Sequence, residues 1–466
     1  MWFNAPRKMT QVNMTNAKKK LYIKTWGCQM NVYDSHRMAD ILKPLGYETV
    51  EGPEGSDMII LNTCHIREKA TDKVFSELGR LRKHKIRKEK AGGKMIMAVA
   101  GCVAQAEGDF ILQRDKSVDM VFGPQSYQDL PEMMIKATGE RVVHTEFPVE
   151  SKFDLLPETT QTQGVSGFLA IQEGCDKFCT FCVVPYTRGS EYSRDINGLV
   201  NETKRMVDNG ARDITLLGQN VNAYHGEGPD GKVWSLARLI EEVAKIDGVE
   251  RIRYTTSHPR DMEKDLLDAH RDIPKLMPYM HLPVQSGSNR ILKAMNRKHD
   301  TDMYRETIAY VRKGRPDIAL ASDFIIGFPG ETDQDFEDTM QLVRDINYSC
   351  AYSFKYSPRP GTPAANMQSL VPEHVKSERL KALQDLLNQQ QHEFNQHTVG
   401  MTLPVLFDRK GKAENQLHGR TPYNQAIHVH ANDRLYGQTI DVKITSASPN
   451  SIKGEVATTE TIVKSA

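Results

Sequence analysis

Short apolar runs alternate with longer amphipathic stretches over the first part of the chain, from residue 19 to residue 136. The apolar runs have the length of buried strands, and the stretches between them repeat their apolar residues with helical spacing. Strands are predicted at residues 21–25, 58–61 and 94–100, and helices at 34–45, 71–83 and 105–113. This alternation is typical of an open parallel α/β sheet, which we predict for residues 19–137.

A second alternating region follows a segment without periodicity. Residues 138–160 are rich in turn-forming and polar residues and are predicted to be a linker. Six strand-like runs come next, each followed by a helical stretch, at residues 167–173, 213–217, 251–255, 279–283, 319–326 and 351–355. They predict a partial TIM-type barrel, (βα)6, over residues 161–397, ending in a long helix at 372–397. Its active site is expected at the carboxyl ends of the strands.

The pattern changes again at residue 398, where short β-like runs replace the βα units. Strands are predicted at residues 403–407, 426–429, 439–444 and 451–456. We predict a small closed β-barrel over residues 398–466, of the kind that binds nucleic acid. Its charge bias is slight, so the expectation of RNA binding rests on architecture.

Composition agrees with a large enzyme of several domains. The chain has 466 residues, of which 39% are hydrophobic and 26% charged, an ordinary globular composition. No stretch approaches the roughly 20 apolar residues that cross a bilayer, so no membrane partner is expected. Residues 1–18 lack the apolar core of a signal peptide and are expected to be a disordered extension. We therefore expect a cytoplasmic protein.

Positive charge is concentrated in one short stretch, although the net charge of the chain is only +1. Residues 80–94 hold eight Lys and Arg side chains and a single acid, Glu89. A solvated helix face and a contact with nucleic-acid phosphates both remain open interpretations of this stretch.

Three cysteines follow Gly174 with the spacing C-x3-C-x2-C: Cys175, Cys179 and Cys182, which we call the loop triplet. Three thiolates hold three irons of a [4Fe-4S] cube and leave the fourth iron open. An open iron can chelate the amino and carboxylate groups of S-adenosylmethionine, which uses such a corner for radical chemistry. Structural zinc sites and bacterial ferredoxins use other spacings. The triplet therefore predicts radical enzymology.

Three further cysteines, Cys28, Cys64 and Cys102, each follow a predicted strand of the amino-terminal sheet; we call them the sheet triplet. Open α/β sheets collect ligands at the carboxyl ends of their strands. If the three strands are parallel neighbours, the three thiols converge, which favours a second cluster. The alternative is that they are small buried apolar residues.

Several local runs, taken together, resemble the methylthiotransferase family of radical S-adenosylmethionine enzymes, and the likeness covers nearly everything from residue 19 onward. The three predicted parts match its amino-terminal methylthiotransferase domain, its radical core and its carboxyl-terminal TRAM domain. One departure is His65, where the family often carries Ser. The runs are Thr25-Trp26-Gly27-Cys28-Gln29-Met30-Asn31, Asn62-Thr63-Cys64-His65-Ile66-Arg67-Glu68-Lys69, Cys182-Val183-Val184-Pro185-Tyr186-Thr187-Arg188-Gly189, Thr256-Ser257-His258-Pro259 and Ser357-Pro358-Arg359-Pro360-Gly361-Thr362.

The resemblance implies an activity on tRNA. The first run is similar to the branch of the family that adds a methylthio group to C2 of N6-dimethylallyladenosine 37, beside the anticodon. The branch that acts on threonylcarbamoyladenosine 37 is the alternative. A different class, an iron–sulfur carrier or scaffold fused to an RNA-binding module, would need closed four-thiolate clusters, whereas both triplets offer three ligands.

The resemblance also implies cofactors, partners and residue roles. S-adenosyl-L-methionine on a [4Fe-4S] cluster held by the loop triplet would give a 5′-deoxyadenosyl radical, and a second [4Fe-4S] cluster on the sheet triplet would supply sulfur. The implied partners are the tRNA anticodon stem-loop, an electron donor and a sulfur or cluster supplier. The expected contacts of the cofactor's adenine, ribose or methionine are Phe181, Gln285, Ser286 and Asp323.

Overall fold

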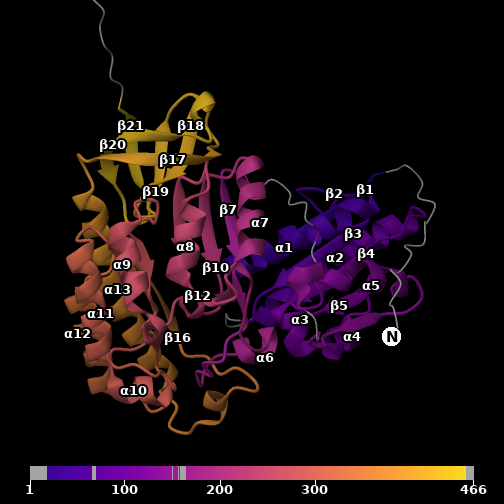
Figure 1. Ribbon diagram of the computed structural model, residues 1–466. Helices are drawn as coiled ribbons and strands as arrows, with labels where there is room; N and C mark the ends of the chain where they lie inside the picture. The colour runs from indigo at the N-terminus through magenta and orange to yellow at the C-terminus, as the bar shows by residue number, and fades with distance from the viewer. Residues whose placement is uncertain (1–17, 66–69, 149–150, 156, 158–163, 458–466) are drawn as a thin grey trace, which may run out of the picture.

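The computed structural model describes residues 18–65, 70–148, 151–155, 157 and 164–457. Its described residues form three parts in chain order: an amino-terminal sheet with helices on both faces, a central half-barrel, and a carboxyl-terminal β-barrel, drawn in yellow in Figure 1. The extension expected at residues 1–18 lies, except for residue 18, outside the described residues. No helix in the described ranges is long and apolar enough to cross a bilayer.

The amino-terminal sheet has six parallel strands in the order β2-β1-β3-β4-β5-β6. The three predicted strands are the neighbours β1 (Lys19–Thr25), β3 (Met58–Thr63) and β4 (Ile96–Gly101), which confirms the parallel sheet. Strand β3 is apolar along most of its length because both of its faces are covered. The remaining strands have only three residues each, too few to show a period: β2 (Tyr47–Thr49), β5 (Met120–Phe122) and β6 (Val142–His144).

Helices cover both faces of this sheet. Apolar residues of α1 (Gln29–Leu42) and α5 (Leu130–Lys136) pack on one face. The other face is covered by α2 (Ala70–Lys90), α3 (Cys102–Glu107) and α4 (Asp109–Arg114). Strand β6 lies inside the segment predicted as a linker, residues 138–160, so the first part of that segment belongs to the sheet.

The central part contains the six predicted strands in two parallel sheets. One has the order β13-β10-β7 and the other β14-β15-β16, and a parallel bridge between Ile252 and Leu276 continues the first toward the second. This arrangement confirms a half-open barrel. The strands are β7 (Ser166–Ala170), β10 (Asp213–Leu217), β13 (Arg251–Tyr254), β14 (Tyr279–His281), β15 (Ala319–Ile326) and β16 (Cys350–Lys355).

Helices line the outside of this half-barrel and bury one large apolar cluster against it. They are α7 (Ile196–Asp208), α8 (Leu236–Ala244), α9 (Lys264–Asp272), α11 (Thr301–Gly314), α12 (Asp333–Ile346) and α13 (Glu373–His397). The sequence did not indicate the antiparallel pairs β11 (His225–Glu227) with β12 (Val233–Ser235) and β8 (Gln172–Glu173) with β9 (Tyr192–Ser193). Each is too short to produce an alternating pattern.

The carboxyl-terminal part is a closed barrel in the order β17-β18-β19-β21-β20. Four of its strands match the prediction: β17 (Thr402–Lys410), β19 (Ala426–His430), β20 (Thr439–Ala447) and β21 (Ile452–Val456). Strand β18 (Gln416–Arg420) was not predicted because its only large apolar residue is Leu417. The barrel encloses its own apolar core.

Two buried arginines dock this barrel onto the amino-terminal ends of the central strands. Arg251 donates to the backbone carbonyls of Arg420 and Pro404 at 2.7 and 2.8 Å. Arg253 donates to the carbonyls of Pro422 and Thr421 at 2.9 and 3.0 Å. In Figure 1 the barrel therefore stands at the opposite end of β7 and β10 from α6 (Val184–Arg188).

Candidate active site

The sheet triplet lies at one edge of the amino-terminal sheet. Cys28, Cys64 and Cys102 follow the carboxyl ends of the adjacent strands β1, β3 and β4. Gly27 (φ 115°) and Gly101 (φ 88°) allow the chain to turn there. A Cβ on Gly27 would lie 2.2 Å from Cys64 Cβ, and one on Gly101 would lie 2.4 Å from the Thr63 carbonyl oxygen. The glycines thus permit the close approach of the three turns.

Two buried asparagines fix the turn that carries Cys28. The Cys28 thiol donates to Asn31 Oδ1 at 3.5 Å, and Asn31 Nδ2 donates to the Trp26 carbonyl at 3.0 Å. Asn62 Nδ2 donates to the Asn31 carbonyl at 2.7 Å and to Ser35 Oγ at 2.9 Å. Both asparagines belong to motif runs, but sequence reasoning gave them no role.

The thiols of the sheet triplet differ in acidity. A hydrogen bond from Cys64 lowers the pKa of the Cys28 thiol to about 6, and the positive charge of Arg188 acts in the same direction. Burial raises the pKa of the Cys102 thiol, and Arg188 opposes that rise. A thiol with a lowered pKa is a thiolate at neutral pH and therefore a ready metal ligand.

The loop triplet lies between β8 and α6, at the carboxyl end of the half-barrel strands. The Cys182 amide donates to the Cys179 carbonyl at 2.9 Å, and Arg297 Nη1 donates to Cys179 Sγ at 3.7 Å. Between the cysteines, Phe178 has a positive φ of 49° and an exposed ring, and Asn296 Nδ2 donates to its carbonyl at 2.9 Å. The loop is therefore held in a conformation that residues other than glycine adopt rarely.

The loop thiols are close enough to affect one another's charge. The pKa of Cys175 is raised to about 11 and that of Cys182 to about 12, mainly by desolvation and in part by the neighbouring Cys179. A bound metal removes such protons because its positive charge stabilises the thiolates.

The donor chemistry of both triplets suits a [4Fe-4S] cluster. All six cysteines are free thiols, and three thiolates bind three irons of such a cube and leave the fourth open. The residues present therefore fit this group at both sites.

Two of the predicted cofactor contacts lie side by side. The Gln285 amide donates to the Asp323 carbonyl at 2.9 Å, and Asp323 Oδ1 lies 3.5 Å from His281 Nε2. Gln285 has a positive φ of 77°, a strained value for a residue with a side chain. Phe181 packs, partly buried, in a small apolar cluster with Phe328.

Ser286 is held within its own loop. Its side chain is buried, its Oγ accepts the Ser288 amide at 3.2 Å, and it lies 3.4 Å from Thr339 Oγ1 on α12. These contacts fix the loop that also carries Gln285. Gln285, Ser286 and Asp323 all stay predicted cofactor contacts.

Two groups to which sequence reasoning assigned no role lie at neighbouring strand ends. Asn220 Oδ1 and Ser257 Oγ are buried without a hydrogen-bond partner among the described residues. Thr256, beside the latter, has a φ of 68°, which is rare for a β-branched residue. Unpartnered buried polar atoms are typical of a site that receives a polar ligand. Ser257 was in a motif run, whereas Asn220 carried only a weak signal as a strand-end residue.

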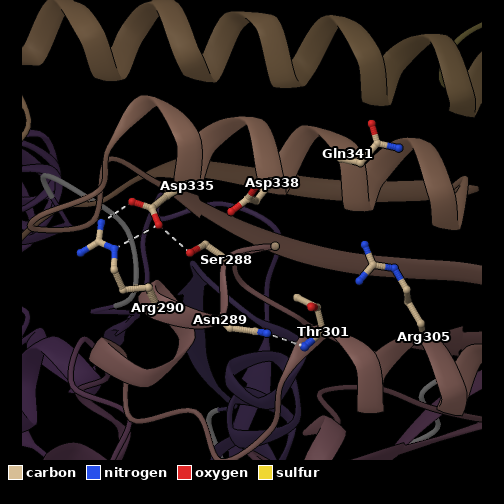
Figure 2. Close-up of a pocket in the computed structure, with 9 residues that line it drawn as sticks. Ser288, Asn289, Arg290, Thr301, Arg305, Asp335, Asp338 and Gln341 are labelled. Atoms are coloured by element: carbon tan, nitrogen blue, oxygen red, sulfur yellow. Dashed lines mark hydrogen bonds and ion pairs between the residues drawn. The ribbon is translucent and has the colours of Figure 1, made fainter.

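A polar pocket of about 350 Å³ lies between α10 (Asn289–Ala294), α11 and α12. Figure 2 shows that two of its lining groups are held by contacts within the pocket: Asp335 accepts from Ser288 Oγ at 2.6 Å and from Arg290, and Asn289 accepts the Thr301 amide at 2.8 Å. This network fixes the loop that follows Gln285. We assign the pocket a structural role.

The basic stretch, residues 80–94, is half neutralised by ion pairs. Arg82 lies 2.6 Å from Asp115, and Lys88 lies 2.5 Å from Asp57. Lys85 and Arg80 have acidic partners as well. Only part of this stretch is therefore available to a polyanion.

Each of the three parts of the chain matches a known family or domain. Residues 20–123 match the uncharacterized protein family UPF0004, residues 169–343 match the radical SAM superfamily, and residues 396–457 match the TRAM domain. Membership of the radical SAM superfamily implies a [4Fe-4S] cluster and S-adenosylmethionine.

Among solved structures, the fold is similar to the radical S-adenosylmethionine methyltransferase TsrM from Kitasatospora setae, with a TM-score of 0.56, 11% identity, and coverage of 75% of this chain and 77% of that one. It is also similar to the cobalamin-dependent radical enzyme OxsB, with a TM-score of 0.51 and 14% identity. This chain covers 56% of the OxsB chain, and OxsB covers 80% of this one. At these identities the likeness shows the fold alone.

Curated relatives are far more similar. The proteins named tRNA-2-methylthio-N(6)-dimethylallyladenosine synthase from Rickettsia rickettsii (strain Sheila Smith) and Rickettsia canadensis are each 58% identical, over 94% of this chain and 99% and 100% of theirs. The chain thus belongs to the methylthiotransferase family of radical S-adenosylmethionine enzymes, and within it to the tRNA-2-methylthio-N6-dimethylallyladenosine synthases.

Proposed function

We propose that this protein converts N6-dimethylallyladenosine at position 37 of tRNA to its 2-methylthio derivative. The observation that carries the proposal is the presence of two separate three-thiol sites, one in each of two packed domains. Three-thiol sites leave a coordination position for a ligand, whereas an electron carrier closes its clusters with four.

The two triplets have different tasks in this proposal. Cys175, Cys179 and Cys182 would hold one [4Fe-4S] cluster, and Cys28, Cys64 and Cys102 would hold the other. When bound, the first cluster with S-adenosylmethionine would supply a radical able to take hydrogen from C2 of adenine, the second would supply sulfur, and a second S-adenosylmethionine would supply the methyl group. Gln285 and Asp323 would orient the S-adenosylmethionine, and Phe181 would contact its adenine.

Little of the described structure lies between the two triplets. Helix α6 begins two residues after Cys182 and packs against α3, whose first residue is Cys102. This packing supports the transfer of sulfur to a substrate activated at the other site. An electron donor and a sulfur or cluster supplier are further partners of the proposed cycle, and the cytoplasm is its proposed location.

Substrate choice tests the proposal directly. In a single-turnover assay, tRNA bearing dimethylallyl-adenosine 37 should gain the methylthio group, and tRNA bearing the threonylcarbamoyl form should not. The reason is that the first motif run, which includes Gln29 and Met30, resembles the dimethylallyl branch. Nucleoside mass spectrometry of each tRNA reads the result, and the reverse preference would establish the threonylcarbamoyl alternative.

We further propose that the carboxyl-terminal barrel binds the tRNA backbone. Lys443 and Lys453 are exposed on β20 and β21. Replacing both with Gln should weaken tRNA binding and reduce the log-log salt slope by about 1.4, since each lost phosphate contact in a single-stranded region removes about 0.7. Filter binding across a salt series measures this change.

The matched control is Lys381→Gln, which removes an exposed lysine from α13. An unchanged slope in the double variant would assign RNA binding to another surface. Deletion of the whole barrel is a poorer test because Arg251 and Arg253 would lose their buried acceptors. The unpaired buried guanidinium groups would then destabilise the half-barrel.

A further inference from the structure

Arg188 is a buried cation that reaches from the central domain into the amino-terminal one. It ends α6, six residues after Cys182, and its side chain is 3% exposed. Its guanidinium donates to Asp34 Oδ2 at 2.7 Å and to Asn31 Oδ1 at 3.4 Å, both on α1. Its backbone carbonyl accepts from Gln125 Nε2 at 2.8 Å. The amino-terminal domain therefore holds both the guanidinium and the backbone carbonyl of Arg188.

The nearest charged groups form a balanced set. Arg188 also pairs with Glu173, and Lys152 pairs with the same two carboxylates, at 2.7 Å from Glu173 and 3.5 Å from Asp34. All four side chains are at most 3% exposed. The attraction between these two cations and two anions thus offsets the free-energy cost of burying them.

The thiols of the sheet triplet lie next to this set. The Cys28 thiol contacts Asn31 Oδ1 at 3.5 Å, and the same oxygen accepts from Arg188 at 3.4 Å. Cys102 begins α3, which packs against α6, the helix that ends at Arg188. Any negative charge that develops at these sulfurs therefore faces a cation supplied by the other domain.

We propose that Arg188 is a positioning residue of the sheet triplet: it stabilises negative charge on the cluster that this site would hold and so raises the reduction potential of that cluster. Reduction adds an electron, and a fixed cation or a donor hydrogen bond near the sulfurs favours the reduced form. The inference rests on the proposed second cluster.

The test isolates the cluster of the sheet triplet. In a Cys175→Ala, Cys179→Ala, Cys182→Ala background, Arg188→Gln should lower the midpoint potential of this cluster. Electron paramagnetic resonance during a redox titration measures the potential. We expect a drop of at least 59 mV, which corresponds to a tenfold change in the reduction equilibrium of a one-electron couple. Arg188→Lys, which keeps the charge, should recover most of the drop.

Two further variants keep the test decisive. Arg194→Gln is the matched control, because Arg194 is similarly buried and donates to Glu202 at 2.6 Å and to the Ala170 carbonyl at 2.7 Å, both in the central domain; its potential should equal that of the triple-Ala parent. If Arg188→Gln alone fails to load iron, the double variant Arg188→Gln, Asp34→Asn removes one charge of each sign and should still have a lower potential than this parent, because the donor to Asn31 beside Cys28 is lost.

Two results would overturn the inference: an unchanged potential in the Arg188 variants, or an equal drop in Arg194→Gln, which would indicate general loosening of the domain contact. The measurement needs no tRNA. If the unsubstituted protein made no methylthio product, that result would contradict the proposed function and would leave this potential comparison standing.

Discussion

Replacing Cys175, Cys179 and Cys182 with Ala is expected to remove about half of the iron and to abolish the cleavage of S-adenosylmethionine. Two [4Fe-4S] clusters correspond to about eight irons per chain, and the variant should retain about four. Cleavage should be lost because the open iron that would bind S-adenosylmethionine belongs to the cluster proposed for the loop triplet. Iron analysis of anaerobically purified protein and chromatographic detection of 5′-deoxyadenosine measure both effects.

Cys350→Ala is the control for this experiment. Cys350 begins β16 and belongs to neither triplet, so its replacement should leave iron content and cleavage unchanged. Full iron content together with undiminished cleavage in the triple variant would refute the assignment of the loop triplet.

The complementary variant, with Ala at Cys28, Cys64 and Cys102, should separate the two halves of the reaction. It is expected to produce 5′-deoxyadenosine but no methylthio nucleoside, because the loop triplet keeps its surroundings while the proposed sulfur source is lost. Cys28 and Cys64 follow the ends of β1 and β3, and Cys102 begins α3 directly after β4, so the sheet itself should persist. Parallel assays of 5′-deoxyadenosine and of digested tRNA follow the two outcomes.

Iron content serves as the internal control here, since this variant should also retain about four irons per chain. Methylthio product at the parent rate would contradict the division of labour between the two triplets. Loss of both 5′-deoxyadenosine and all iron would instead indicate that the sheet triplet is required for the central domain to fold.

The sequence predicted those elements whose residues carry a strong local signal. Central strands such as β3 are apolar because both faces are buried, and each triplet cysteine was placed correctly at a strand end or loop. Strands such as β6 and β18 were missed. The first has three residues and the second a single large apolar side chain, so neither alternates visibly.

Contacts between distant segments could not be predicted in this way. Arg188 meets Asn31 and Asp34 across more than 150 residues of sequence, and no local periodicity encodes such a pair. Likewise, the direction of the Ser286 hydroxyl depends on Thr339 of a later helix. The sequence indicates which residue types gather at an edge, but the packing of domains decides which way they point.

The placement of the carboxyl-terminal barrel sets a minimum length for an RNA that uses the whole protein. The barrel meets the central strands at their amino-terminal ends through Arg251 and Arg253, whereas the loop triplet lies at their carboxyl ends. A five-residue strand alone spans about 17 Å at about 3.3 Å per residue. A free nucleoside can reach only one of these two ends at a time. An RNA held at both ends of the strands would be selected by its length as well as by its modified base.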